Sequence, residues 1–397
     1  MNTKINDKIS WVGYVDWNVR DFHGYQTEHG ATYNAYLIQD EKTVLVDTVK
    51  SHFASELIKN ISELTPLDKV DYVICNHAEI DHSSSLPIIM QKLPNAVLVC
   101  NASCKKALSA YYDTSEWKWK IVENGEMLKI GEKTLHFIFT PMVHWPESMF
   151  TYVPEDKLLF SMDAFGQHLA SSERFDDELQ LNDILREAKT YYANIVMPYG
   201  NQVLKTLTAA ANLEINTICT SHGVIWRKNL PAILNAYKRW ASGEIEPKVL
   251  ILYDSMWEST SRLAKAVYAG VLEIPGISAQ LLHVRRTSLT EIATAAMDCG
   301  CCAVGSATLN TLQMPMISAA MTYLQGLRPP IKHTFAFGSY GWGKGAVEEI
   351  STWFEKVKWT PIQDPVKCIF RPDADSLEKC REAGRILAQK ALEMTKN

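Results

Sequence analysis

Short apolar runs that end in polar side chains recur through the first 245 residues and constrain the fold most strongly. β-Branched and aromatic residues dominate these runs, as is typical of strands. The runs are KTVLVDTV (43–50), VDYVICNH (70–77), TLHFIFTPMVHW (134–145), KLLFSMDAFG (157–166) and INTICTSHG (215–223). Segments between them, such as 51–62 and 176–195, have helical spacing. The first part of the chain is therefore expected to layer helices against sheets.

The pattern changes after residue 245 to a regular alternation of strands and helices. The segment KVLILYD (248–254) predicts a buried strand, and residues 260–274 have the spacing of a helix. Two more buried strands, at 301–307 and 333–339, each open into a loop. This alternation predicts a doubly wound parallel sheet. We expect two domains, residues 1–245 and residues 246–397.

The composition excludes several classes of protein. A hydrophobic content of 47% in 397 residues is enough for large globular cores. A net charge of -5 without a clustered basic stripe argues against nucleic-acid binding. The chain shows neither a signal-peptide core nor a long apolar run, so we expect a cytoplasmic protein that does not enter membranes.

Nine scattered cysteines are expected to be buried, reduced thiols. Cys299 and Cys302 form a C-x-x-C pair, but no second pair follows at metal-site spacing. We therefore expect this pair to pack in the interior of the protein.

The segment NHAEIDHSSS (76–85) concentrates metal-binding side chains in the turn after a predicted strand. Three further candidates each follow another predicted strand. Together the candidates are His77, Glu79, Asp81, His82, His144, Asp163 and His222. Because the ends of neighbouring strands bring side chains together, we expect one shared site.

Four imidazoles and three carboxylates can serve two metal ions. One set would be His77, Glu79 and His144, the other Asp81, His82 and His222, with Asp163 as the bridge. Two histidines and one carboxylate suit non-haem iron with open positions. Whether His82 binds its ion stays open.

Three loops at the ends of the predicted parallel strands form a candidate cofactor site in the second domain. The loop YDSMWESTSRLA (253–264) offers hydroxyl and N–H groups where a helix begins, which suits a phosphate, although such residues also cap helices. The loops GSATLN (305–310) and GSYGWGKGA (338–346) offer glycines and aromatic rings to a flat ligand. The expected contacts are Ser255, Met256, Trp257, Ser259, Thr260, Ala307, Thr308, Leu309, Asn310, Ser339, Tyr340, Gly341, Trp342 and Gly343.

The metal loop resembles that of the metallo-β-lactamase superfamily, whose zinc hydrolases carry H-x-H-x-D-H. Here Glu79 replaces the second histidine, and an anionic oxygen ligand favours iron. The three loops of the second domain resemble those of flavodoxin, which binds FMN noncovalently. Over essentially all 397 residues, the chain resembles the flavodiiron proteins, or A-type flavoproteins. Further segments that carry this resemblance are 22–38, 142–152, 163–168 and 221–226.

The resemblance implies a metallo-β-lactamase-like αβ/βα sandwich followed by a flavodoxin-like domain, with two non-haem irons and FMN as cofactors. It implies reduction of O2 to water, of NO to nitrous oxide, or of both, and the preference stays open. Electrons would arrive from rubredoxin, reduced by an NADH-dependent partner, and pass through FMN. No fused donor module is recognised, so the donor is expected to be a separate protein or coenzyme.

The resemblance also implies head-to-tail homodimers or homotetramers, in which FMN of one subunit lies beside the diiron site of the other. His23 and Tyr191 would donate protons or hydrogen bonds near the irons, with Tyr192 as the alternative to Tyr191. For His168 a structural hydrogen bond is expected.

Two other functions remain as alternatives. One is a zinc hydrolase fused to a flavodoxin-like module, which Glu79 disfavours. The other is a flavin-dependent electron carrier with a structural metal site. Bound iron together with turnover of O2 or NO would support the diiron oxidoreductase and exclude both the hydrolase and the electron carrier.

Overall fold

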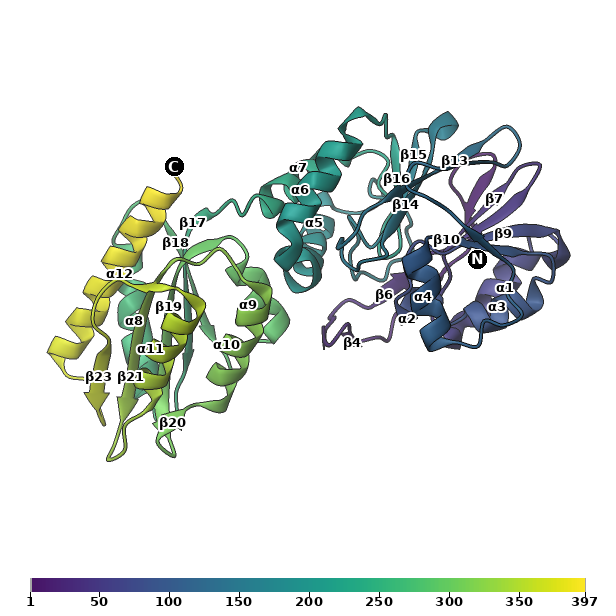
Figure 1. The fold of residues 1–397 in the computed structure, drawn as a ribbon. Helices are drawn as coiled ribbons and strands as arrows, with labels where there is room; N and C mark the ends of the chain where they lie inside the picture. The colour runs from purple at the N-terminus through teal and green to yellow at the C-terminus, as the bar shows by residue number, and fades with distance from the viewer. Residues whose placement is uncertain (1, 397) are drawn as a thin grey trace. The chain divides into compact units, whose positions relative to one another are not determined.

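The computed structural model describes residues 2–396 and divides the chain into two compact units (Figure 1). The first comprises the chain up to residue 191 together with residues 199–238. The second comprises residues 192–198 and the chain from residue 239 onward. The short segment 192–198 thus packs with the second unit, and the division into domains at residue 246 stays a prediction.

Two sheets form the centre of the first unit. The larger joins, in spatial order, β1 (Thr3–Lys4), β2 (Ile9–Trp11), β7 (Tyr36–Gln39), β8 (Thr43–Val46), β9 (Val70–Ile74), β10 (Val97–Cys100) and β11 (Trp119–Ile121). The smaller joins β12 (Met127–Lys129), β13 (Thr134–Phe139), β14 (Met149–Val153), β15 (Leu158–Met162) and β16 (Thr217–Thr220). Each of the five predicted apolar runs contains one of these strands.

The alternation of side chains along the strands fills two cores. Val44 and Val46 of β8 face Phe137 and Val153 in a core shared by the two sheets. Leu45, between the two valines, faces the opposite way into a core beneath the helices of the larger sheet. Those helices are α1 (Ala54–Ser62), α3 (Leu86–Lys92) and α4 (Ala102–Tyr111). On the side of the smaller sheet lie α5 (Leu181–Tyr191), α6 (Gly200–Ala209) and α7 (Leu230–Ala241) (Figure 1).

Small elements supply the loops around the site. They are the ribbon of β3 (Tyr14–Asp16) and β6 (Ala31–Tyr33), the hairpin of β4 (Asp21–Phe22) and β5 (Tyr25–Gln26), and the one-turn helix α2 (Ile80–Ser83). The short turns are η1 (Ser51–Phe53), η2 (Leu67–Lys69), η3 (Pro154–Asp156), η5 (Met197–Tyr199), η6 (Ala210–Asn212) and the π-helical η4 (Tyr192–Val196).

The helix expected over residues 176–195 is shorter than its periodicity predicts. Asp176 at its predicted start is buried, and its carboxylate accepts backbone N–H groups from Arg227 at 2.8 Å and Asn229 at 2.6 Å. These tertiary bonds hold Asp176 in a loop, so that α5 begins only at Leu181. At the other end the α-helix stops at Tyr191 and widens into the π-helical η4.

The second unit is built on a parallel sheet. Its order is β18 (Ser278–His283), β17 (Glu246–Asp254), β19 (Cys299–Leu309), β21 (His333–Tyr340) and β22 (Thr360–Pro361), with β23 (Val366–Ile369) also beside β21. Among the described pairings of this sheet, only that of β20 (Leu312–Gln313), a short return next to β19, is antiparallel. The strand order reverses on either side of β17, so the predicted doubly wound sheet is confirmed.

Helices cover both faces of this sheet. Val249 and Ile251 of β17 pack beneath α8 (Ser259–Leu272) and α12 (Ala374–Met394). Leu250 and Leu252 face the opposite layer, which consists of α9 (Leu289–Ala296), α10 (Pro315–Leu327) and α11 (Ala346–Val357). All nine cysteines are buried and unbridged. The C-x-x-C pair lies within β19, and both of its thiols pack in the interior as expected.

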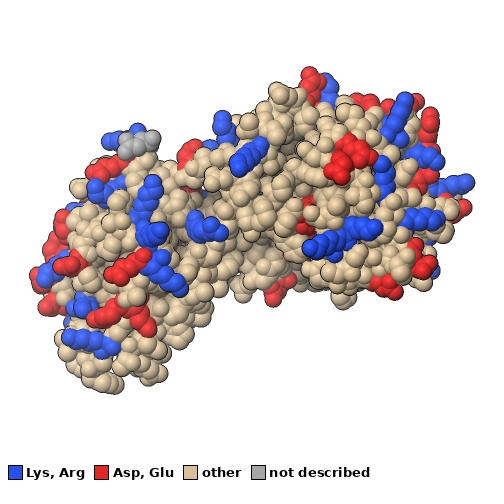
Figure 2. Space-filling model, viewed as in Figure 1, with Lys and Arg blue, Asp and Glu red and all other residues tan. Residues whose placement is uncertain are grey.

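Charged side chains of both signs are interspersed over the visible face of each unit (Figure 2). Among residues 2–396, no helix combines the length and the apolar character needed to cross a membrane.

Gly384 allows α12 to lie close against α8. A Cβ at this position would meet the backbone oxygen of Val267 at 2.1 Å, and backbone cannot move aside as a flexible side chain can. We expect Gly384→Ala to lower the free energy of unfolding of the second unit by about 1–3 kcal/mol. Gly326 in α10 is the matched control, since its Cβ would meet no atom within 4 Å. Gly326→Ala should raise stability by about 1 kcal/mol, because alanine is the better helix former.

Urea unfolding followed by hydrogen exchange of the β17 and β21 amides would measure both changes. Equal effects of the two substitutions would show that the close approach of the helices is not the cause.

Candidate metal centre and cofactor pocket

The loop after β9 carries four of the predicted metal ligands. His77 and Glu79 lie in the loop itself, and Asp81 and His82 lie on the single turn of α2. The hydroxyl of Ser83 donates to the backbone oxygen of Ala78 at 2.7 Å and closes the turn. The turn thereby directs all four side chains to one side of the strand ends.

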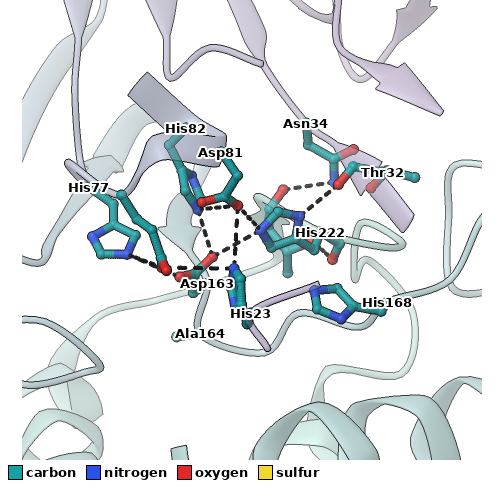
Figure 3. Close-up of polar contacts among 12 residues, drawn as sticks. His23, Thr32, Asn34, His77, Asp81, His82, Asp163, Ala164, His168 and His222 are labelled. Atoms are coloured by element: carbon teal, nitrogen blue, oxygen red, sulfur yellow. Dashed lines mark hydrogen bonds and ion pairs between the residues drawn. The ribbon is translucent and has the colours of Figure 1, made fainter. Parts of the chain in front are cut away.

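The other three predicted ligands follow strands of the smaller sheet, and Figure 3 shows two of them, Asp163 and His222. His144 lies in the loop after β13, Asp163 follows β15 directly, and His222 follows β16. All three are buried, with relative exposures of 8%, 1% and 1%. The edges of the two sheets thus bring together residues that lie up to 145 positions apart in the chain.

Asp163 lies between two groups of donors. Its Oδ2 atom is 3.0 Å from Nε2 of His144 and 3.3 Å from Nε2 of His77. Its Oδ1 atom is 3.0 Å from Nε2 of His82 and 3.3 Å from Nε2 of His222. Each oxygen of one carboxylate therefore faces a different pair of histidines, which is the geometry of a bridging ligand.

A second carboxylate completes each group. In the first group, Oε2 of Glu79 is 3.2 Å from Nε2 of both His77 and His144. In the second, Oδ2 of Asp81 is 3.3 Å from Nε2 of His82 and 3.1 Å from Nε2 of His222. The possible ligand atoms of each group lie within 4.8 Å of one another. We call the groups subsite A (His77, Glu79, His144) and subsite B (Asp81, His82, His222).

Buried atoms at the centre lack ordinary hydrogen-bond partners. These atoms are both carboxylate oxygens of Asp81, Oδ1 of Asp163, and Nε2 of His82 and of His222. Buried polar groups without partners are costly, and a cation among them would satisfy several at once. The donor set therefore fits two metal ions of the kind that accept nitrogen and oxygen ligands.

The electrostatics of the site favour positive charge. Burial opposes protonation of His77, but hydrogen bonds with Glu147 and Glu79 outweigh it and raise the pKa to about 10. Burial likewise opposes the charge of Glu79, yet hydrogen bonds with His144 and His77 lower its pKa to about 2. A pocket that holds protons on imidazoles this strongly also attracts metal cations, which would take the place of those protons.

Two ligand histidines are oriented by groups behind them. Nδ1 of His77 lies 2.8 Å from Oε1 of Glu147, and Nδ1 of His222 lies 2.6 Å from the backbone oxygen of Thr32. Each contact fixes the ring so that Nε2 points to the centre. Asn34 supports the His222 loop by donating to the backbone oxygen of Thr220 at 2.8 Å and to that of Gly223 at 3.0 Å (Figure 3).

His23 and Tyr191 lie beside the metal centre. His23 projects from the β4–β5 hairpin, and its Nε2 is 3.6 Å from Oδ2 of Asp81. The rings of His23 and Tyr191 have centroids 6.4 Å apart, and the buried Tyr191 hydroxyl has no hydrogen-bond partner. The ring of Tyr192 instead packs against Trp240 at 5.4 Å. Of the two adjacent tyrosines, Tyr191 is the one beside the donor cluster.

Sequence patterns did not single out two charged neighbours of the site. Glu147 lies three residues beyond His144, and this short distance in sequence from a predicted ligand was the available signal that Glu147 lies near the metal site. Nζ of Lys50 lies 4.1 Å from the centre of the Phe22 ring. Burial lowers the pKa of Lys50, while nearby carboxylates, led by Asp81, oppose that shift. The hydrogen bond expected for His168 is present, between its Nδ1 and the hydroxyl of Tyr25 at 2.8 Å.

A pocket of about 720 Å³ opens at the carboxyl ends of β17, β19 and β21. All the predicted cofactor contacts line it except Ser255 and Thr260. Thr260 is buried and shares a hydrogen bond of 2.8 Å with Ser339, which ties the first loop to the third. Ser255 accepts a hydrogen bond of 3.3 Å from the backbone of Ser261. Both act within the loops that surround the pocket.

The pocket also contains residues that the sequence patterns missed, namely Arg262, Thr311, Phe370 and Arg371. Arg262 lies in the first turn of α8, where the helix N-terminus and a cation together suit a phosphate. Trp257 and Trp342 flank the pocket and are 87% and 97% exposed. Open aromatic rings beside an anion site fit a flat, phosphorylated ligand such as FMN.

Comparisons with known proteins identify a family for each part of the chain. Residues 31–223 match the family described as ODP family beta lactamase, and residues 251–384 match flavodoxin. A nitric oxide reductase of Moorella thermoacetica is 42% identical, with 97% of each chain covered.

Two solved structures share this architecture. The flavodiiron protein of Giardia intestinalis superposes with a TM-score of 0.96 and is 38% identical, over 100% of this chain and 98% of that one. Rubredoxin:oxygen oxidoreductase of Desulfovibrio gigas superposes with a TM-score of 0.95 and is 34% identical, over 99% of each chain.

A sandwich with a paired metal site, followed by a flavodoxin fold, defines an oxidoreductase that joins a binuclear centre to a flavin. The chain belongs to the flavodiiron proteins. The predicted family, fold class and cofactors, FMN and two non-haem irons, are thereby confirmed. Which residues of this chain hold them stays a proposal.

Asp163→Ala removes the carboxylate that faces both subsites. We expect the bound iron to fall from two ions per chain to fewer than one, because each ion loses an oxygen ligand and two cations then lie close together without a shared anion. Glu79→Ala should retain more iron, since only subsite A loses a ligand. Iron analysis after anaerobic reconstitution would compare the two variants. Equal losses would argue against a bridging role for Asp163.

Proposed function

We propose that this protein reduces O2 to water, NO to nitrous oxide, or both, at the diiron site, with electrons delivered through FMN. The observation that carries the proposal is the paired donor set around Asp163, in which Glu79 stands where zinc hydrolases have histidine. Relatives support it. One is named nitric oxide reductase, one rubredoxin:oxygen oxidoreductase, and several anaerobic nitric oxide reductase flavorubredoxin.

The cofactors supply the electrons for this chemistry. Two ferrous ions and reduced FMN hold four electrons, the number that converts O2 to two water molecules, whereas two NO molecules need two. The residues of the chain hold the ions, exclude bulk water and place proton donors. His77, Asp163 and His222 are at most 1% exposed. Such burial strengthens electrostatic interactions at the centre.

The centre is partly open near His23. The side chain of Glu79 is 20% exposed and that of His23 is 10% exposed, whereas that of Asp81 is 4% exposed. A diatomic gas is small enough to approach there. His23 and Tyr191 would meet it at this side.

Tyr191 is suited to donate a hydrogen bond. Burial, and secondly the charge of Asp163, raises its pKa well above the ordinary value for tyrosine. The hydroxyl therefore stays protonated at neutral pH, and in this structure its proton is not committed to another residue. It can stabilise negative charge that develops on a reduced substrate.

We further propose that rubredoxin, reduced by an NADH-dependent partner, supplies electrons, and that the chain forms head-to-tail dimers or tetramers. The name of the Desulfovibrio gigas relative supports the donor. The exposed rings of Trp257, Trp342 and Phe370 around the flavin pocket support an interface, since aromatic residues are enriched there. A cytoplasmic location also remains a proposal.

The electron balance tests this function directly. The protein would be loaded with iron and FMN, reduced anaerobically and given measured pulses of O2 or NO while flavin absorbance is followed. We expect one O2 to reoxidise one fully loaded site without release of peroxide. Slow reoxidation with peroxide, or bound zinc with hydrolase activity, would instead support the carrier or the hydrolase. Comparison of the two gases ranks them as substrates.

His144→Asn separates the two halves of the reaction. Flavin reduction should be unchanged, because the pocket of the second unit is intact. Turnover of O2 or NO should fall by about 10²-fold or more, since subsite A loses a ligand. Unchanged turnover would place the chemistry at the flavin.

Tyr191→Phe tests the hydrogen-bond donor. We expect kcat to fall by about 10²-fold while the iron and FMN contents stay at wild-type values. Tyr192→Phe is the matched control, because Tyr192 packs against Trp240. Steady-state gas consumption would measure both. Equal effects of the two variants would assign Tyr191 a structural role.

A further inference from the structure

The two iron subsites have the same inner ligands and different surroundings. Each comprises two imidazoles, one carboxylate and one oxygen of Asp163. Inner ligands alone would therefore give the two irons similar reduction potentials. Any difference between them must come from the groups around the ligands. The buried carboxylate of Asp47 interacts with both His82 and His77, whereas Glu147 and Lys50 each lie on one side only.

A buried anion supports subsite A. The carboxylate of Glu147 is 2.8 Å from Nδ1 of His77 and accepts the backbone N–H of Ala78 at 3.1 Å. Glu147 is 3% exposed, and its backbone oxygen accepts a hydrogen bond of 2.6 Å from Asn101. The negative charge is thus held one hydrogen bond away from a ligand of the subsite A ion.

In subsite B, the hydrogen-bond partner of His222 is neutral, and a cation lies nearby. His222 donates from Nδ1 to the backbone oxygen of Thr32 at 2.6 Å, which carries no net charge. The ammonium of Lys50 lies 4.1 Å from the centre of the Phe22 ring, and that ring lies 5.4 Å from the ring of His222. The positive charge of Lys50 is therefore separated from subsite B by one aromatic ring.

These surroundings act in opposite directions on oxidised iron. A carboxylate bonded to an imidazole N–H makes that imidazole a stronger donor and stabilises the higher metal charge. A nearby cation destabilises the higher charge. Both effects lower the potential of the subsite A ion relative to that of the subsite B ion.

We propose that Glu147 is a positioning and charge-tuning residue that makes the subsite A iron the last to be reduced. The inference rests on the proposed diiron function. With two irons and FMN bound, the subsite B ion would accept the first electron from reduced FMN and the subsite A ion the second. In a half-reduced centre, His77, Glu79 and His144 would then hold the ion that is still ferric.

Glu147→Gln removes the charge and leaves an amide oxygen that can accept the same two hydrogen bonds. Redox titration of the iron-loaded holoprotein, followed by the EPR signal of the half-reduced centre, would locate the two one-electron steps. We expect the reduction potential of the lower-potential step to rise and that of the other step to stay unchanged. The EPR signal of the half-reduced centre should become weaker, because the two potentials lie closer together. In chelator competition one of the two irons should dissociate about 10- to 100-fold more readily.

Lys50→Met tests the opposite side with an independent variant. Removal of the cation should lower the reduction potential of the higher-potential step and leave that of the other step unchanged. The difference between the two potentials should therefore become smaller. The Lys50→Met titration remains informative if the Glu147→Gln variant fails to bind iron. Glu123→Gln is the control for a surface charge change, because Glu123 is exposed, and both steps should stay where they are.

The outcomes separate the inference from the function on which it rests. A wild-type protein that binds no iron pair would contradict the proposed function itself. With two irons bound, the inference is overturned if Glu147→Gln moves both steps equally or moves only the higher one. It is also overturned if neither Glu147→Gln nor Lys50→Met narrows the gap.

Discussion

The rest of the structure depends on one carboxylate that faces two pairs of imidazoles. Asp163 is 1% exposed, and its two oxygens lie 3.0–3.3 Å from the Nε2 atoms on either side. A buried carboxylate is costly unless positive charge surrounds it. The fold meets this requirement by placing Asp163 directly after β15, at the sheet edge where the loops after β9, β13 and β16 also converge. The sandwich can therefore be understood as a scaffold that holds one anion in a pocket whose donor set fits two cations.

Precise placement of the ligands requires contacts between distant parts of the chain. The backbone of Thr32 fixes His222, and Glu147 fixes His77, across 190 and 70 residues of sequence. Asn34 holds the loop that carries His222. Loops that are fixed by buried hydrogen bonds lose little freedom when metal binds, so the affinity for metal is not reduced by an ordering cost. The same bonds give each ring one orientation, which a bridged pair of ions demands.

The sequence was sufficient to predict much of the fold and of the candidate site, but it was not sufficient for some parts. The ligand loop and the strand-end residues are visible as polar side chains after apolar runs, because the ends of strands meet at an edge. The candidate phosphate loop and the glycine loops of the second unit are visible for the same reason. Arg262 and Arg371 are not, because only tertiary contact distinguishes them from other surface-type residues, and for Glu147 the spacing from His144 is the one local signal. Asp176 shows the same limit in the fold, since bonds to residues 227–229 override its local helical spacing.

The choice between Tyr191 and Tyr192 illustrates what periodicity cannot resolve. Both are fully buried, and adjacent helical positions differ by about 100° in direction. The α-helix ends at Tyr191 and a π-helical turn follows, so the rings leave the chain in different local geometries. Tyr191 comes to lie beside the rings of His168 and His23, at 4.9 and 6.4 Å. A π-helical turn inside a helix is frequent at functional sites, and here it directly follows the tyrosine beside the donor cluster.

Charge explains why one scaffold can serve either hydrolysis or redox chemistry. Three carboxylates among the seven donors carry three negative charges, while two ferrous ions carry four positive charges and two ferric ions carry six. A glutamate in place of a neutral histidine at position 79 therefore reduces the excess positive charge of both oxidation states, and of the ferric pair in particular. A zinc pair never changes its charge and does not need this additional anionic ligand. Glu79 also occupies the more exposed side of the centre, where its charge is partly screened by solvent and its desolvation cost is correspondingly smaller. The substitution that distinguishes this loop from that of the zinc hydrolases thus adds its charge at the most exposed of the three carboxylates.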